Sequence, residues 1–173
     1  MTIKRRGTTS ALKRLAYAQL LILGFSLTHA IQAAPASSLM SGFNPLIGGQ
    51  WVLGSTYQTY TWGPDRQSVF GESFVIQNGE KALGAKGLWY FDPASKTIKG
   101  VFVATNMPFT VLHYRSHFEA GTLISQVRSL DNLGTENHYQ ETIRVTQPDA
   151  YLWELTEAEP AGNTMKAEFH RAP

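Results

Sequence analysis

The stretch HYRSHFEAG, residues 113 to 121, carries several side chains that could bind a metal ion or move a proton. His113 and His117 stand four residues apart, with Arg115 between them and Glu119 just beyond. On a helix, two histidines at this spacing lie one turn apart and can bind one metal ion. On a strand the rise is about 3.3 Å per residue, which places them about 13 Å apart and rules out a shared ion. The backbone conformation therefore decides between a metal site and two solvated side chains.

The residues around the two histidines predict a strand. The segment is rich in aromatic and β-branched residues, and Pro108 and Gly121 bound it. Strand alternation places Leu112, Tyr114, Ser116 and Phe118 on one face and Val111, His113, Arg115 and His117 on the other. The first face is more apolar, so we expect it to point inward and the histidines to lie on a solvated outer face. A ligand or partner patch on that outer face is the alternative, and we predict no metal site.

Two carboxylates form a second group that could carry chemistry. In residues 135–146 the more apolar face, which we expect to point inward, contains Tyr139 and Glu141. In residues 66–76 the face with Phe70 and Phe74 also contains Glu72, so an inward orientation of these rings places Glu72 inside. The opposite face of that segment, with Val69, Ser73 and Val75, is the alternative inward face. An isolated buried carboxylate has a raised pKa and can act as a general acid or base. The alternative is that each carboxylate is hydrogen-bonded to Tyr or Ser, or lies near a wet barrel mouth.

Aromatic side chains accompany Glu141 on the predicted inward faces of the later strands. The candidates for lining a binding cavity are Tyr114, Tyr139, Glu141, Tyr151 and Trp153. Aromatic walls with few polar groups suit a small, largely apolar molecule. Glu141 and Glu72 are the weaker candidates for a catalytic role, since each could also be a polar anchor.

The elements that position these residues are ten strand-like segments separated by evenly spaced turns. We predict strands at about 50–53, 57–62, 66–76, 82–91, 97–105, 109–118, 122–130, 135–146, 150–156 and 164–170. Asn78-Gly79 is the strongest turn signal, because both residues tolerate positive φ. Short connections without βαβ units predict an all-β, antiparallel up-and-down barrel, which removes exposed strand edges. Residues 37–46 are expected to form a short turn or lid. In residues 82–91 the inward face is ambiguous: it contains either Leu83, Trp89 and Phe91 or Leu88 and Tyr90.

The first residues are expected to be a secretory signal peptide. Basic residues precede an apolar run at 15–27, and small residues follow it. We predict a signal peptide at 1–34, cleaved somewhere in 30–36, and one barrel domain at 37–173 in the periplasm or outside the cell. An uncleaved membrane anchor is the alternative, although the apolar run is too short to span a bilayer. No other stretch predicts a membrane span, and the pattern carries no signal for oligomeric state.

Charge and composition exclude several classes of protein. The chain has 15 Lys and Arg against 13 Asp and Glu, but five basic and no acidic residues precede position 37. The predicted mature domain therefore has a net charge of −3, which argues against nucleic-acid binding. The absence of cysteine excludes disulfides and thiolate metal sites. We find no GxSxG elbow and no phosphate-binding glycine loop. His170, the only histidine near the C-terminus and the one candidate for a haem ligand, falls on an outward strand face. We therefore predict no cofactor.

The two ends of the predicted barrel resemble those of lipocalins. GGQW at 48–51 opens the first strand like the Gly-x-Trp start of that family, with Gly49 and Trp51, and FHR closes the last strand with Arg171. YTWGPDR (60–66) and GLWYFDP (87–93) resemble segments of small bacterial lipocalin-like proteins of unknown function. The resemblance implies a calycin-type barrel in which Arg171 packs across Trp51. We therefore expect an exported barrel that binds a small apolar ligand; an enzyme acting on such a molecule by proton transfer is the alternative.

Overall fold

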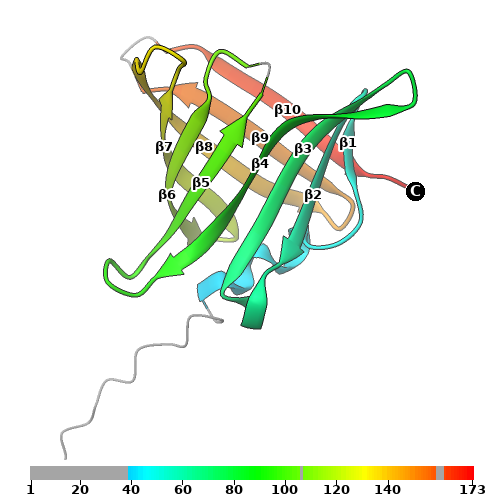
Figure 1. The fold of residues 1–173 in the computed structure, drawn as a ribbon. Helices are drawn as coiled ribbons and strands as arrows, with labels where there is room; N and C mark the ends of the chain where they lie inside the picture. Colours follow the sequence, from blue (N-terminus) through cyan, green and yellow to red (C-terminus); the bar gives the residue numbers. More distant parts are fainter. Residues whose placement is uncertain (1–38, 106, 159–161) are drawn as a thin grey trace, which may run out of the picture. The chain divides into compact units, whose positions relative to one another are not determined.

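Ten antiparallel strands follow one another around a closed barrel, as Figure 1 shows. The computed structural model describes residues 39–105, 107–158 and 162–173. The strands are β1 (Trp51–Leu53), β2 (Thr56–Trp62), β3 (Ser68–Gln77), β4 (Glu80–Asp92), β5 (Thr97–Ala104), β6 (Val111–Glu119), β7 (Thr122–Leu130), β8 (Glu136–Gln147), β9 (Ala150–Glu157) and β10 (Thr164–Arg171). Each strand pairs with its sequence neighbours, and β1 pairs with β10. The predicted all-β, ten-stranded up-and-down barrel is confirmed.

Tight turns join the strands at the expected places. Asn78 and Gly79 have φ of 53° and 81°, so the two residues that connect β3 to β4 both adopt the left-handed conformation that a two-residue hairpin turn requires. Farther along the same hairpin, Ser73 of β3 pairs with Ala85 of β4, and Phe74 pairs with Leu83. This register leaves Gly84 as an unpaired bulge in β4. The bulge reverses the facing of the residues on either side of it.

A short 3-10 helix closes one end of the barrel. This helix, η1 (Met40–Leu46), lies beneath the strands in Figure 1 and buries Met40, Phe43 and Leu46 almost completely. The ring of Phe43 packs edge-on against Phe118 at a centroid distance of 5.0 Å. A second 3-10 turn, η2 (Pro64–Arg66), joins β2 to β3. The lid that the sequence suggested near residues 37–46 is thus an apolar plug at the closed end.

The first and last strands meet at the same end through a tryptophan and an arginine. Trp51 pairs with Arg171 in the ladder, and the guanidinium carbon lies 4.2 Å from the centroid of the indole ring. Trp51 is fully buried and donates its Nε1–H to the Leu46 carbonyl at 2.9 Å. Arg171 donates to the carbonyls of Pro45 and Gly48. The contact expected between Arg171 and Trp51 is present, and it also holds η1 against the strand ends.

Alternation along most strands agrees with the predicted inward faces. On β6, Leu112 and Ser116 are buried while Arg115 and His117 are exposed; on β8, Glu141 is buried. On β4, the structure divides the predicted set of Leu83, Trp89 and Phe91. Trp89 points inward, whereas Leu83 pairs with Phe74 and points outward with it. The bulge at Gly84 explains this division, because strict alternation cannot hold across it.

The predicted signal peptide, with its cleavage at 30–36, lies outside the described residues. Within residues 39–173, apart from the undescribed 106 and 159–161, there is no helix with the length and apolar character to cross a membrane.

Replacing Arg171 should destabilise the barrel without changing its chemistry. Arg171→Ala removes a cation–π contact and three hydrogen bonds to the carbonyls of Pro45, Gly48 and Pro148, so we expect the free energy of unfolding to fall by about 2–3 kcal/mol. Arg171→Lys should restore only part of this loss, because an ammonium group cannot reach all three carbonyls and cover the indole. Urea denaturation of both variants and of Arg144→Ala, an exposed arginine on β8, measures the effect. Equal loss in Arg171→Ala and Arg144→Ala would contradict the structural role.

Candidate functional site

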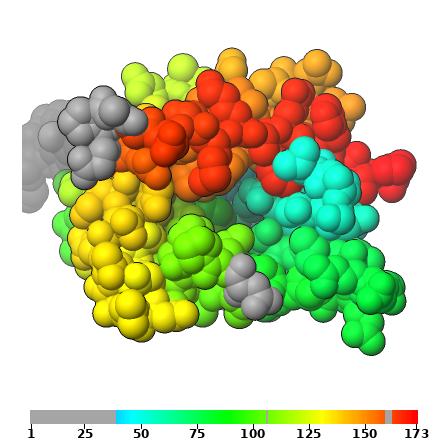
Figure 2. Space-filling view, turned by 90° about the horizontal axis from the view of Figure 1, so that it is seen from above, coloured from blue at the N-terminus to red at the C-terminus, as the bar shows by residue number. Residues whose placement is uncertain are grey.

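A cavity of about 460 Å³ lies inside the barrel above the closed end. Its lining is mainly apolar and aromatic and includes Tyr60, Ala85, Trp89, Phe102, Met107, Phe109, Leu112, Tyr114, Tyr139, Glu141, Ile143, Trp153, Leu155, Glu157 and Met165. Figure 2 looks down on the opposite end from η1, where a hollow lies between the loop that joins β5 to β6 and the strands of the C-terminal half. The cavity has the volume and the lining of a small-molecule site.

Glu141 is the buried charged group of this cavity. It projects from β8 and is only 6% exposed, and its Oε1 accepts a hydrogen bond of 2.8 Å from the indole Nε1 of Trp153. Its Oε2 is buried without a hydrogen-bond partner. Burial raises the pKa of Glu141 to about 7, and the Trp153 hydrogen bond opposes part of that shift. A carboxyl group in this state can accept a hydrogen bond or a proton from a molecule in the cavity.

Hydrogen-bonded side chains form the floor of the cavity. The hydroxyl of Tyr60 donates to Oε1 of Gln58 at 2.7 Å, and Tyr151 donates to the same oxygen. Tyr151 is fully buried beneath the cavity, where its ring packs edge-on against Trp51. Burial also raises the pKa of both tyrosines above the usual value, so they remain neutral donors. Of the five predicted lining residues, Tyr114, Tyr139, Glu141 and Trp153 line the cavity, whereas Tyr151 supports its floor.

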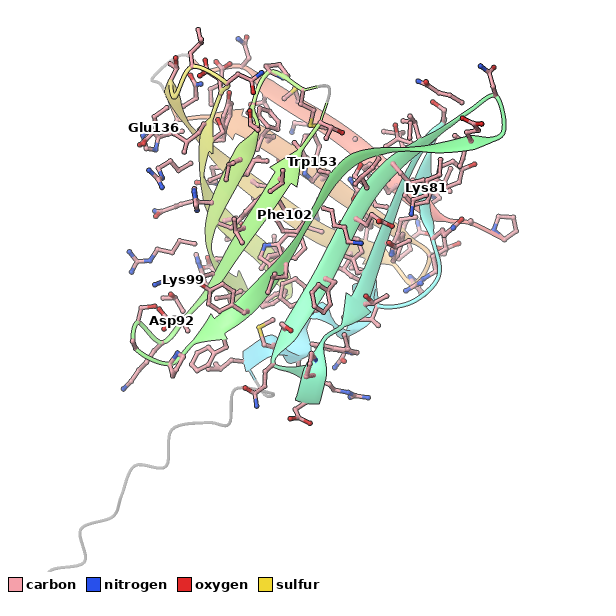
Figure 3. The ribbon with its side chains drawn as sticks, in the orientation of Figure 1. Lys81, Asp92, Lys99, Phe102, Glu136 and Trp153 are labelled. Carbon is pink, nitrogen blue, oxygen red and sulfur yellow. The ribbon has the colours of Figure 1, made fainter. Side chains whose placement is uncertain are left out.

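Another wall of the cavity contains two aromatic rings that the predicted site did not include, those of Trp89 and Phe102. Trp89 and Phe102 pack with their ring centroids 4.4 Å apart, and Tyr114 contacts both. Figure 3 labels Phe102 on β5 and Trp153 on β9, whose side chains lie within the barrel. A Cβ atom at Gly71 would lie 2.9 Å from ring atoms of Phe102 and Trp89, so a glycine is required there. Inward glycines opposite large aromatic residues are the sequence signal that marks this wall.

Glu72 is among the residues that line the cavity, but its carboxylate lies on the outer face of β3, so its predicted inward orientation is wrong. It pairs with Lys86 across β3 and β4, and its carboxylate forms ion pairs with Lys81 and Lys86. The hydrogen bond from Lys81 is the main cause of the lowered pKa of Glu72. The facing was misassigned because bulky residues were taken as inward, whereas the interior requires Gly71 beside the aromatic rings. The outward Phe74 is instead covered by Tyr57, whose ring stacks on it at 5.3 Å.

The histidines at 113 and 117 lie on the outer face of β6, as the strand pattern predicts. His113 pairs with Arg128 on β7, which in turn pairs with His138 on β8. These side chains line a shallow outer groove in which Glu136 forms ion pairs with Arg128 and His138. In the part of the chain that the structure describes, no three His, Asp or Glu side chains come together as a metal site. His170 is exposed on β10, 3.9 Å from the carboxylate of Glu168.

The fold and cavity define a closed, ten-stranded antiparallel barrel with an internal aromatic chamber, in which Glu141 is the buried carboxyl group among the described residues. No family model matches the chain, and no curated protein matches it in sequence. The site therefore has to be interpreted from its own geometry.

The raised pKa of Glu141 predicts a particular dependence of stability on pH. Its folded-state value of about 7 exceeds the ordinary value of 4.5, so the folded protein holds this proton more tightly than the unfolded chain. Its contribution is therefore fully present below pH 4.5 and is lost as the pH rises through 7. Relative to Glu141→Gln, the wild type should lose about 2–3 kcal/mol of unfolding free energy between pH 5 and pH 8. Urea denaturation of both proteins at the two pH values measures this difference.

Glu72→Gln is the matched control, with the opposite sign. Because the pKa of Glu72 is lowered, its ion pair stabilises the fold above the unfolded pKa and is lost as the pH falls through the folded value. The same pH dependence in wild type and Glu141→Gln would show that Glu141 is not a buried, proton-holding group.

Proposed function

We propose that this protein binds a small, largely apolar molecule inside the barrel. The observation that supports this most strongly is the cavity itself, whose aromatic and aliphatic lining contains one buried carboxylate oxygen without a partner. An orphaned buried acceptor costs free energy unless a ligand or water satisfies it. A ligand that covers the apolar walls and donates one hydrogen bond to Glu141 would remove both penalties.

The closed end supports placing the chain among lipocalin-like barrels of the calycin class. Gly49 precedes Trp51, and the guanidinium of Arg171 covers that indole from the last strand. The antiparallel order with β1 beside β10 is consistent with this proposal. The proposal concerns architecture, because barrels of this kind serve many functions.

A signal peptide at the N-terminus would place this binding site in the periplasm or outside the cell. The basic residues, apolar run and small residues before position 37 support export. N-terminal sequencing of the exported protein should give a first residue between 31 and 37. A chain that keeps Met1 would contradict cleavage.

Filling the cavity should abolish binding. Ala85 points inward from β4 and lines the cavity, so Ala85→Trp places an indole in the ligand volume. We expect isothermal titration with 1-decanol, a neutral apolar probe, to show binding to the wild type and an affinity lower by about tenfold or more in Ala85→Trp. Lys86→Gln, the next residue and exposed on the outer face, should bind like the wild type. Equal binding by all three proteins would place the probe outside the barrel.

A proton-transfer enzyme acting on an apolar molecule is the second candidate function. The unpartnered Oε2 of Glu141 and a pKa of about 7 favour it, because a general base works best near the ambient pH. This function requires turnover of the bound molecule that Glu141→Gln abolishes while binding of a neutral ligand persists. Unchanged turnover in Glu141→Gln would exclude Glu141 as the base.

A further inference from the structure

The charged groups around the cavity have one sign. Among the residues that the structure describes, the lining includes no Lys, Arg or His, and its charged members are Glu72, Glu141 and Glu157. The carboxylate of Glu72 is neutralised by lysines on the outer face. Glu157 accepts hydrogen bonds from Asn163 where β9 meets the loop to β10. Glu141 is therefore the carboxyl group that a molecule deep in the cavity meets, and no cationic side chain of the described lining lies beside it.

The hydrogen bonds of Glu141 leave a position for one donor. Trp153 occupies Oε1, whereas Oε2 is buried and has no partner. The Nε1 of Trp89 is a second unpartnered atom of the lining, but it is a neutral donor and does not set the charge of the ligand. Ser125, which pairs with Glu141 across β7 and β8, is hydrogen-bonded to Ser116 at 2.8 Å. The partner that Oε2 lacks has to come from the cavity.

Aromatic rings surround the same space. Phe102, Tyr114, Tyr139 and Trp153 all line the cavity with Glu141. The negative face of an aromatic ring attracts a cation, and this attraction is strongest where water is excluded. Burying an ammonium group is costly unless a counter-ion and hydrogen bonds compensate for its lost hydration. A carboxylate among aromatic rings provides the counter-ion, a hydrogen-bond acceptor and the ring faces together.

We propose that the ligand is an apolar amine, bound with its ammonium group at Oε2 of Glu141 and its hydrocarbon part against the apolar walls of the cavity. This inference rests on the proposed binding function and adds the charge of the ligand. The inference predicts that the cavity does not prefer fatty acids. A carboxylate ligand would lie beside the carboxylate of Glu141, and the described lining has no basic residue to pair with it. A neutral alcohol fits the same volume but forgoes the ion pair.

Three probes that differ only in their head group test this selectivity. Decylammonium, 1-decanol and decanoate carry the same hydrocarbon chain, and isothermal titration below their micellar concentrations measures each affinity. We expect the wild type to bind decylammonium about tenfold tighter than 1-decanol and to bind decanoate more weakly than either. Glu141→Gln keeps the shape of the side chain and the acceptor for Trp153 but removes the charge, so the ratio of its affinities for decylammonium and 1-decanol should fall to about one. Ala85→Trp should bind each of the three about tenfold or more weakly than the wild type, whereas attraction of the cation to the outer surface would leave the binding of decylammonium unchanged.

The outcomes separate this inference from the proposed function. If 1-decanol binds but decylammonium binds no tighter, the cavity is a binding site and the inference is wrong. An amine preference that persists in Glu141→Gln also overturns it. If none of the three probes binds the wild type, both the proposed function and the inference fail. A preference that Glu141→Gln removes, together with weaker binding by Ala85→Trp, supports the inference.

Discussion

The contact between Arg171 and Trp51 is the constraint on which the remaining structure depends. It joins the last strand to the first, where only a few residues of β1 complete the ladder, and its hydrogen bonds to Pro45 and Gly48 fix the segment that carries η1. With the apolar side chains of η1 in place, one end of the barrel is filled by packed side chains. The unfilled interior is thereby confined to the other end, which is where the cavity lies.

The cavity combines features that normally oppose each other. Its rings of Trp89, Phe102 and Tyr114 pack closely enough to require glycine at position 71, so this wall resembles a well-filled core. Across from them, a carboxyl group is buried with one oxygen unsatisfied. An apolar side chain of similar size would avoid the cost of burying this group. Glu141 is therefore the residue on which the proposals of ligand binding and of proton transfer both rest.

Much of the fold follows from the sequence because alternation and turn chemistry act locally. Asn78-Gly79 defines its hairpin by φ alone, and the inward face of β6 with Leu112 and Tyr114 follows from simple alternation. Alternation also identified Glu141. It failed for Glu72, because the choice between two faces of β3 depends on the space available to rings from other strands. For Trp89 alternation left two faces of β4 open, because the bulge at Gly84 interrupts the pattern, and Phe102 was not among the predicted lining residues.

The location of the ligand tests the central claim most directly, and methyl-labelled NMR spectroscopy can measure it. In a complex with 1-decanol, we predict nuclear Overhauser effects from the alkyl chain to the methyl groups of Leu112 and Ile143, which line the cavity. Contacts confined to residues of the outer groove, such as Thr156, with no transfer to Leu112 or Ile143, would contradict an internal binding site.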